Sequence, residues 1–428
     1  MFRLTPHNRA TTILLFNIIL FALVSCGGGS NSSDSLIAGS TASSNSSNNS
    51  NGAGPVVWED TYNGIHYFQT FDSQIQNVSL TASHSVFVWG VEQSVSAYRA
   101  SSNPKITLSY YVPWAYDPDA THDLSYWKNF HPDWVLYKCD KVTPAYFSTT
   151  LNMPLDISNP DVIAWQVQNA ATQASSQGYD AIAADEYSLG GWGGCGIYKN
   201  GQWKQLYTSG YDDPQSDKDA VAWASAYRKQ IHALPHPLGL IPNFQYDGRP
   251  LNDPTLLGVV ANVDGILDEC SFTGCGSGNL SGQNWLNMVT FIEYVQQQGK
   301  AYMAINQAMT NDNAGLQWGL ASYLMGKEHA AGLYLVSAKQ YQQLAGSDLW
   351  RSEYSAPIGT PCSAMQATQG AYMRVYQGGL AIVNPSANSI NFLLPSGVYT
   401  DLYGVAIGAS VTLNPSSGLV LLTSKQQC

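Results

Sequence analysis

The stretch GYDAIAADEY, residues 178–187, is the part of the sequence that decides the fold. Its apolar run Ala181–Ala184 starts after a turn and stops at two acidic residues. A short run that is apolar on both faces is typical of a strand buried in a parallel sheet. A helical pattern over residues 162–177 precedes it and ends at Gly178. A helix that leads into a buried strand indicates an α/β fold.

Outward from this stretch, seven more short apolar runs alternate with helical patterns, among them 219–233 and 283–298. Eight such units, with no dinucleotide-binding glycine fingerprint after the first strand, predict a (β/α)₈ TIM barrel rather than an open sheet. The eight expected strands are Val86–Trp89, Ile106–Val112, Trp134–Tyr137, Ala181–Ala184, Leu238–Ile241, Gly265–Leu267, Ala301–Ile305 and Gly332–Val336.

The pattern changes after about residue 355, where short alternating strands are separated by Pro, Gly and Ser turns. This predicts a small C-terminal antiparallel β-sandwich domain. We therefore expect a barrel over residues 56–355 and a β domain over residues 356–428. The expected strands of the second domain are Ala371–Tyr376, Leu380–Val383, Ile390–Leu394, Val398–Leu402 and Leu419–Leu422.

The N-terminus has the pattern of a bacterial lipoprotein. Residues 1–25 combine two arginines with a short apolar run and end just before Cys26, as a lipoprotein signal peptide does. The apolar run is shorter than the roughly 20 residues that a transmembrane anchor, the alternative, requires. Residues 26–55 are rich in Ser, Asn and Gly and predict a flexible tether. With Gly27 after the lipidated Cys26, we expect export and an anchor in the outer membrane or at the cell surface.

Composition narrows the class of protein. Only 11% of the 428 residues are charged, the net charge is −11, and no basic stripe is present, which argues against nucleic acids and acidic polymers as partners. The 12 Trp and 26 Tyr residues suit stacking on sugars. We expect a monomer that needs no cofactor.

The cysteine count also points to an exported protein. Six cysteines besides Cys26 can pair completely, as expected in an oxidising compartment. The expected pairs are Cys270–Cys275, Cys362–Cys428 and, by remainder, Cys139–Cys195. Because neither a CxxC nor an HExxH pattern occurs, we expect no metal site.

Two expected strands, the fourth and the sixth, end in an Asp-Glu pair: Asp185-Glu186 and Asp268-Glu269. Active sites of TIM barrels lie at these strand ends. Glycosidic cleavage needs two carboxyl groups, one to protonate the leaving oxygen and one to act as nucleophile or to activate water. Since strand side chains alternate, one acid of each pair is expected to face the barrel mouth. The alternative is that these acids serve as salt bridges or helix caps.

Other polar and aromatic residues near strand ends are candidates for binding the substrate. Their alternative is core packing or turn formation. The candidates are Tyr111, Trp114, Lys138, Asp140, Trp192, Asn243 and Asn306, with Gln245 and Gln307 beside the last two.

The segments 110–113, 132–138, 154–160 and 178–185 resemble a family of hypothetical glycoside hydrolases, the fifteenth of the glycosidase-like TIM-barrel families. The resemblance covers roughly residues 80–350 and implies a carbohydrate substrate. The layout is also similar to polygalactosaminidase-type and α-galactosidase-type barrels. That similarity implies Asp185 as nucleophile and Glu269 as acid/base, with Glu186 and Asp268 in reserve.

The sequence thus predicts a glycoside hydrolase that acts on an extracellular or cell-surface polysaccharide. A non-catalytic carbohydrate-binding surface lipoprotein is the alternative, and a purely structural lipoprotein is a third. The separation of the two carboxyl groups would determine whether the enzyme retains or inverts configuration.

Overall fold

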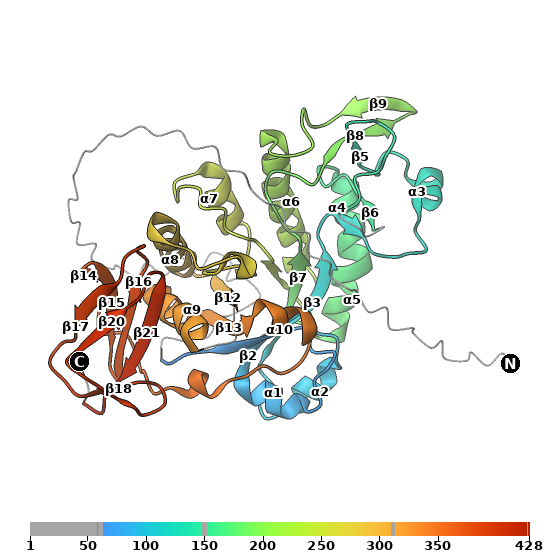
Figure 1. Cartoon of the computed structure of the whole chain (residues 1–428). Coiled ribbons are helices and arrows are strands. Elements are labelled where there is room, and N and C mark those ends of the chain that lie inside the picture. The colour runs from blue at the N-terminus through green and yellow to red at the C-terminus, as the bar shows by residue number, and fades with distance from the viewer. Residues whose placement is uncertain (1–57, 59–62, 148–151, 310–312, 426) are drawn as a thin grey trace, which may run out of the picture. The chain divides into compact units, whose positions relative to one another are not determined.

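Eight parallel strands form the central sheet of the computed structural model, which describes residues 58, 63–147, 152–309, 313–425 and 427–428 (Figure 1). The expected signal peptide, Cys26 and the tether lie outside the described residues. The strands are β1 (Tyr67–Thr70), β2 (Ser85–Trp89), β3 (Thr107–Pro113), β7 (Ala181–Asp185), β10 (Gly239–Pro242), β11 (Gly265–Asp268), β12 (Ala301–Ala308) and β13 (Ala331–Ser337).

The sheet runs in the order β10-β7-β3-β2-β1-β13-β12-β11. Its two end strands meet through a parallel bridge between Asn243 and Leu267 and a hydrogen bond of 2.8 Å from the Phe244 N–H to the Leu267 carbonyl. The sheet therefore closes on itself as a barrel. The predicted TIM-barrel fold is confirmed.

A helical segment follows each barrel strand. They are α1 (Val78–His84), α2 (Val95–Arg99), α4 (Pro160–Gln166) continued by η1 (Val167–Ala171) and α5 (Thr172–Gln177), α6 (Pro214–His232), α7 (Pro254–Ala261), α8 (Gly282–Gln297), α9 (Asn313–Gly326) and α10 (Ala338–Gln343). The helical patterns over 162–177, 219–233 and 283–298 are thereby confirmed.

Three of these helices begin in the same way: the N-cap residue is Asn or Asp, and the first helical residue is proline. Asn159, Asp213 and Asp253 each accept a hydrogen bond from a backbone N–H of the first turn of α4, α6 and α7. Proline suits the first helical position because its missing N–H would have no helical partner there. At the other end of the α4–α5 segment, Gly178 takes a left-handed conformation with φ of 81°.

Two strand expectations are wrong. Trp134–Tyr137 is not a barrel strand; its side chains pack in a separate core with Trp127 and Leu155. The barrel strand that was not predicted is β1, so that the run at 106–112 belongs to the third strand rather than the second. The fourth and sixth positions are unaffected.

The chain between β3 and β7, and the loop after β7, build an additional region that appears at the upper right of Figure 1. It contains helix α3 and two small antiparallel sheets, and the Cys139–Cys195 disulfide ties its two parts together. Its elements are α3 (Leu124–Phe130), β4 (Tyr116–Asp117), β5 (Tyr137–Lys138), β6 (Met153–Pro154), β8 (Gly194–Lys199) and β9 (Gln202–Gln205).

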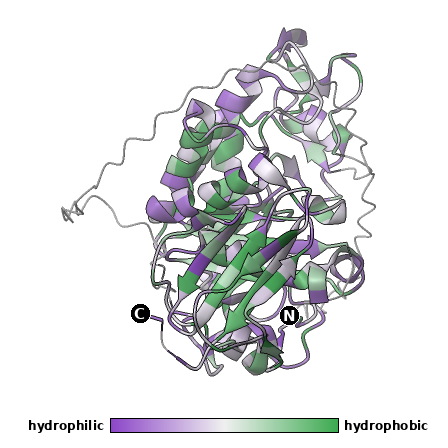
Figure 2. Ribbon diagram, turned by 60° about the vertical axis from the view of Figure 1, so that its left-hand side comes forward, coloured by the Kyte–Doolittle hydropathy of each residue, from purple (hydrophilic) through white to green (hydrophobic). Residues whose placement is uncertain are grey.

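The C-terminal region is antiparallel β structure, as predicted. A sheet of order β14-β15-β16-β21-β18-β19 faces a two-stranded sheet β17-β20 across a core that includes Leu380, Phe392 and Leu421. Figure 2 shows apolar residues along these strands. The strands are β14 (Gln366–Thr368), β15 (Ala371–Tyr376), β16 (Gly379–Asn384), β17 (Ile390–Leu393), β18 (Tyr399–Thr400), β19 (Ala406–Ile407), β20 (Ser410–Leu413) and β21 (Ser417–Leu422).

The larger C-terminal sheet packs on helix α9 of the barrel. Gly418 of β21 lies against Ala321, where a Cβ would collide with the helix. Buried Arg374 of β15 donates hydrogen bonds to the carbonyls of Leu324, Met325 and Lys327 at the end of α9. Because barrel and sheets belong to one compact unit, the domain boundary at residues 355/356 stays a prediction.

The three predicted disulfides, Cys139–Cys195, Cys270–Cys275 and Cys362–Cys428, are confirmed. In the described part of the chain, no helix is long and apolar enough to cross a membrane.

Candidate active site

Three neighbouring strands of the barrel bring two carboxylates together around one amide. Asp185 ends β7, Asn243 follows β10, and Glu269 follows β11. The Asn243 Nδ2 donates hydrogen bonds to the Asp185 Oδ1 at 2.9 Å and to the Glu269 Oε2 at 3.0 Å. Strand order explains the meeting, because β10 lies between β7 and β11 in the closed barrel.

These two hydrogen bonds limit the separation of the carboxylates. Since both start from one nitrogen, the Asp185 Oδ1 and the Glu269 Oε2 cannot lie more than about 6 Å apart. The two N–H bonds of an amide diverge by about 120°, which brings the accepting oxygens to about 5 Å from each other. A glycosidic bond can be bracketed by carboxyl groups at this spacing.

Asp185 is buried, with 6% of its surface exposed, and is held by three hydrogen bonds. Its Oδ1 accepts from Asn243 and from the Glu186 N–H at 2.9 Å, and its Oδ2 accepts from the Tyr111 hydroxyl at 2.8 Å. Burial raises the pKa of Asp185, whereas all three hydrogen bonds favour the ionised form and oppose that rise. Oδ1 thus uses both of its lone pairs, and Oδ2 keeps one free.

Glu269 has a pKa raised above the ordinary value, first by burial and then by the negative charge of Asp185. Hydrogen bonds from Asn243 and from the Tyr341 hydroxyl lower it in part. The Glu269 carbonyl accepts a hydrogen bond from the Gln307 Nε2 at 3.1 Å. The two carboxyls therefore differ: three donors favour ionised Asp185, and the charge of Asp185 favours protonated Glu269.

Glu186 brings a third carboxyl toward this pair because its backbone departs from the strand. Its φ of 59° is left-handed, which is uncommon for a residue other than glycine, and its carbonyl accepts a hydrogen bond from the Trp192 Nε1 at 3.2 Å. Burial, followed by the charges of Asp185 and Glu269, raises the pKa of Glu186 to about 8. The side chain therefore lies within electrostatic reach of both other acids.

Asp268 faces away from the barrel mouth. Its side chain is fully buried; Oδ2 accepts from the Tyr302 hydroxyl at 2.7 Å, and Oδ1 accepts from the Cys270 and Ser271 N–H groups. Burial raises its pKa. The pair at the end of β11 thus follows strand alternation, with Glu269 directed to the mouth and Asp268 to the surrounding shell.

Of the residues expected to bind substrate, Tyr111 and Asn243 contact the carboxylates directly, and Trp192 contacts the Glu186 backbone. Trp114 is buried, with 2% exposure, and packs edge-on against Tyr187 and Trp223, which leaves it no free face for a sugar.

Asn306, Lys138 and Asp140 lie elsewhere. Asn306 is fully buried against Gly319 of α9, and its neighbour Gln307 takes the position facing Glu269. Lys138 belongs to β5 of the additional region, and the Asp140 carboxylate accepts from the backbone of its own turn. The expectation that these two follow a barrel strand is wrong, because Trp134–Tyr137 is not one.

Sequence reasoning missed Tyr341, which α10 carries after the last barrel strand. The signal was weak, because Tyr341 does not end a strand. Ser337 starts the helix with a capping box, and one turn of helix then places the Tyr341 hydroxyl on Glu269.

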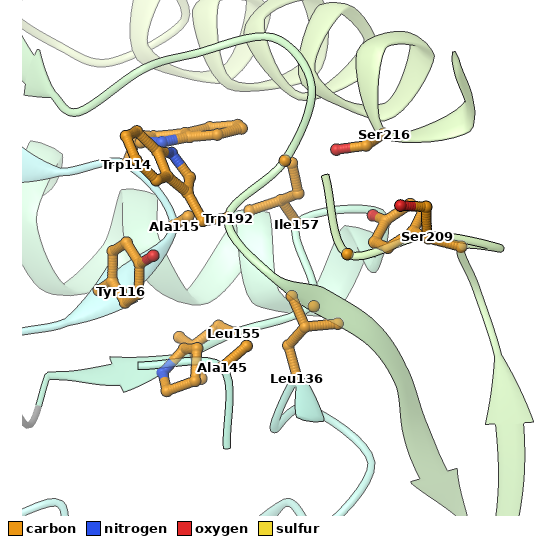
Figure 3. Close-up of a pocket in the computed structure, with 15 residues that line it drawn as sticks. Trp114, Ala115, Tyr116, Leu136, Ala145, Leu155, Ile157, Trp192, Ser209 and Ser216 are labelled. Atoms are coloured by element: carbon orange, nitrogen blue, oxygen red, sulfur yellow. The ribbon is translucent and has the colours of Figure 1, made fainter. Parts of the chain in front are cut away.

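Figure 3 shows a cavity whose lining includes none of these carboxyls. It has a volume of about 30 Å³ and an aromatic and apolar lining that includes Trp114, Tyr116 and Trp192. That volume accommodates water molecules but not a sugar ring. Within the described ranges, no group of three or more His, Cys, Asp and Glu side chains is arranged to hold a metal ion.

Several solved structures of glycoside hydrolases are similar to this chain. The glycoside hydrolase domain of PelA from Pseudomonas aeruginosa is 12% identical, with 65% of this chain and 97% of that chain covered and a TM-score of 0.42. The maltogenic α-amylase AmyB from Thermotoga neapolitana is 9% identical, with 83% and 98% covered and a TM-score of 0.44. The α-galactosidase AgaA from Geobacillus stearothermophilus is 11% identical, with 84% and 56% covered and a TM-score of 0.42.

No curated protein matches the sequence. A family model does: the one described as hypothetical glycosyl hydrolase family 15 matches residues 95–380, which is more than half of the chain. That range contains all three carboxyls at the barrel mouth. The expected family resemblance is confirmed, and the chain belongs to this family of glycoside hydrolases.

Proposed function

We propose that this enzyme hydrolyses O-glycosidic bonds of an extracellular or cell-surface polysaccharide with retention of configuration, using Asp185 as nucleophile and Glu269 as acid/base. The observation that carries the proposal is the single Asn243 amide that donates to both carboxylates. Retaining enzymes hold their two carboxyl groups about 5–5.5 Å apart, and inverting enzymes about 6.5–9.5 Å apart. The limit of about 6 Å that Asn243 sets between the Asp185 Oδ1 and the Glu269 Oε2 favours retention.

In the first step, Asp185 attacks the anomeric carbon. Its Oδ2 is the attacking atom, because Oδ1 already accepts two hydrogen bonds and Oδ2 accepts only one, from Tyr111. Glu269 gives its proton to the leaving oxygen as the glycosidic bond breaks. The products of this step are a glycosyl ester on Asp185 and an ionised Glu269.

In the second step, Glu269 takes a proton from water, which attacks the ester and releases Asp185. The change of role follows from electrostatics, because the negative charge of Asp185 is one cause of the raised pKa of Glu269. Ester formation removes that charge and lowers the pKa of Glu269, so the residue that was an acid is now a stable base. When Asp185 is freed, its charge returns and favours protonated Glu269 again.

The charges at the site favour a neutral or cationic glycan. The charges that act on Glu186 are those of Asp185 and Glu269, and the charges that act on Glu269 are those of Asp185 and Asp268, so that all of them are negative. A uronic acid placed among them would meet like charges in a poorly solvated site. The overall net charge of −11 acts in the same direction.

The test is digestion of a panel of neutral, amino-sugar and uronic-acid polysaccharides, with products identified by mass. Asp185→Asn and Glu269→Gln serve as matched variants, because each keeps the shape and removes the charge or proton. We expect both to lose at least about 10²-fold in kcat on an unactivated glycan. Proton NMR of the first product should show the retained anomer. An inverted product, or full activity of either variant, refutes the mechanism.

We further propose that the enzyme works outside the cell, anchored by a lipid on Cys26. The three disulfides support export, because such bonds persist in oxidising compartments. Metabolic labelling with a radioactive fatty acid should mark the wild type and not Cys26→Ala, and fractionation should find the label in the outer membrane or at the cell surface. Equal labelling of both proteins contradicts the anchor.

A further inference from the structure

The turn that follows Glu269 is closed by the Cys270–Cys275 disulfide. Glu269 is therefore the residue immediately before a covalently closed ring of the chain. Within that ring Cys275 has a φ of 55°, a left-handed conformation that is unfavourable for a residue with a side chain and persists only where the surroundings hold it.

Asp268 holds the start of the same turn from the other side of the strand. Its Oδ1 accepts hydrogen bonds from the Cys270 N–H at 3.1 Å and from the Ser271 N–H at 2.9 Å, and Tyr302 fixes its Oδ2. Glu269 thus lies between Asp268, whose carboxylate accepts hydrogen bonds from two N–H groups of the turn and from the Tyr302 hydroxyl, and Cys270, which is fixed by a covalent bond.

The closed turn also packs on α9 and on α10, the helix whose Tyr341 contacts Glu269. The Phe272 carbonyl accepts from the Trp318 Nε1 at 3.0 Å, and the Phe272 side chain is fully buried. Gly276 lies against Ala338, in the first turn of the helix α10 that carries Tyr341. Any shift of the turn therefore moves Glu269 relative to its hydrogen-bond partner on α10.

The length of the ring indicates that this disulfide does little for global stability. Closing a loop stabilises a fold more when the loop is longer. The separations are 5 residues for Cys270–Cys275, 56 for Cys139–Cys195 and 66 for Cys362–Cys428. The bond with the smallest expected contribution to folding is the one next to the acid/base.

We infer that the Cys270–Cys275 disulfide and the Asp268 carboxylate are positioning elements, which together fix the direction of the Glu269 carboxyl toward the leaving group. The inference rests on the proposed acid/base role of Glu269. It also implies that a reducing environment weakens proton transfer by this enzyme before it unfolds the barrel.

The test compares leaving groups, because acid catalysis matters only where the departing oxygen needs a proton. The probes are 2,4-dinitrophenyl and 4-methylphenyl glycosides of whichever sugar the panel identifies. In the double variant Cys270→Ser/Cys275→Ser we expect kcat/KM to fall about tenfold or more on the 4-methylphenyl glycoside, and far less on the dinitrophenyl glycoside. Asp268→Asn, which keeps the disulfide, should show the same selective loss.

The matched control is Cys362→Ser/Cys428→Ser, which opens the longer ring of the C-terminal sheets. It should lower the melting temperature more than the first pair does and should change the ratio of the two rates little. An unchanged ratio in both Cys270→Ser/Cys275→Ser and Asp268→Asn overturns the inference. Failure of the proposed function looks different, because Glu269→Gln would then cleave the 4-methylphenyl glycoside at the wild-type rate.

Discussion

Asn243 is the residue whose removal tests the arrangement of the site most directly. Its Nδ2 hydrogen-bonds the Asp185 Oδ1 and the Glu269 Oε2, and no other side chain described here bridges these two acids. Asn243→Ala therefore removes one donor from the nucleophile and one from the acid/base in a single step. The two losses should appear in different limbs of the pH–rate profile.

The size of the effect follows from the hydrogen bonds. Asp185 must be ionised, so activity is lost as the pH falls through its pKa, and a donor that stabilises the carboxylate lowers that pKa. A hydrogen bond to a charged group contributes about 1.5–3 kcal/mol, and one pKa unit corresponds to about 1.4 kcal/mol. Asn243→Ala should thus raise the pKa of Asp185 and move the acidic limb of the profile to higher pH by about one to two units.

The alkaline limb should move in the same direction. Glu269 must be protonated at the start, so activity is lost as the pH rises through its pKa. Asn243 lowers that pKa by donating to the carboxylate form. Its removal raises the pKa, and the whole profile moves upward.

Tyr111→Phe is the matched control. The Tyr111 hydroxyl donates to the Asp185 Oδ2 and not to Glu269. This variant should raise the acidic limb alone and narrow the profile. The measurement is kcat/KM from about pH 3 to pH 10 on one substrate for all three proteins. If Asn243→Ala moves only one limb, or Tyr111→Phe moves both, the assignment of the two acids is wrong.

Three further predictions concern residues around this centre. Glu186→Gln should remove an ionisation near pH 8 from the pH–rate profile, because burial and the charges of Asp185 and Glu269 raise the pKa of Glu186 to about 8; the acidic limb should stay. The ratio of the activity at pH 9 to the activity at pH 7, compared between the variant and the wild type, measures this. Complete inactivity of the variant at every pH would instead make Glu186 the acid. Trp192→Ala should raise KM up to about tenfold with kcat little changed if the ring stacks on the substrate, as initial-rate kinetics will show. Arg374→Met should lower the free energy of unfolding by about 3 kcal/mol in denaturant titrations, while kcat stays within twofold. The variant removes the hydrogen bonds that Arg374 donates to carbonyls at the end of α9 and its 2.7 Å ion pair with Glu328. An unchanged unfolding midpoint contradicts this prediction.

Much of the barrel could be predicted because its strands are apolar on both faces. The unpredicted strand, β1, breaks that rule. Its residue Gln69 is fully buried and is satisfied by the Tyr67 hydroxyl and by the carbonyls of Thr70, Phe71 and Ser347. Ser347 lies 278 residues further along the chain, so the sequence around Gln69 does not reveal that its amide has this partner. Trp134–Tyr137 was predicted as a barrel strand and is not one, because a short apolar run does not indicate in which core of the protein it packs.

The candidate site could be predicted as two pairs of acids but not as individual residues. Alternation predicts that one member of the β11 pair faces the mouth, and only the position of Tyr302 on the next strand determines that Asp268 faces outward. For the β7 pair the rule fails. Glu186 leaves the strand in a left-handed conformation that sequence does not predict for glutamate.

The raised pKa of Glu186, together with its irregular backbone, argues for a role of this residue at the site. The folded-state pKa of about 8 lies above the ordinary value of 4.5, so ionisation of Glu186 in the fold costs stability that is intact at low pH and lost as the pH rises from 4.5 to 8. A glutamine with the same backbone would avoid that cost. A strained residue that also lowers stability is expected where it serves the chemistry. Here the third carboxyl stays protonated up to about pH 8 beside Asp185 and Glu269, so that it can donate a hydrogen bond at the barrel mouth while Asp185 is ionised.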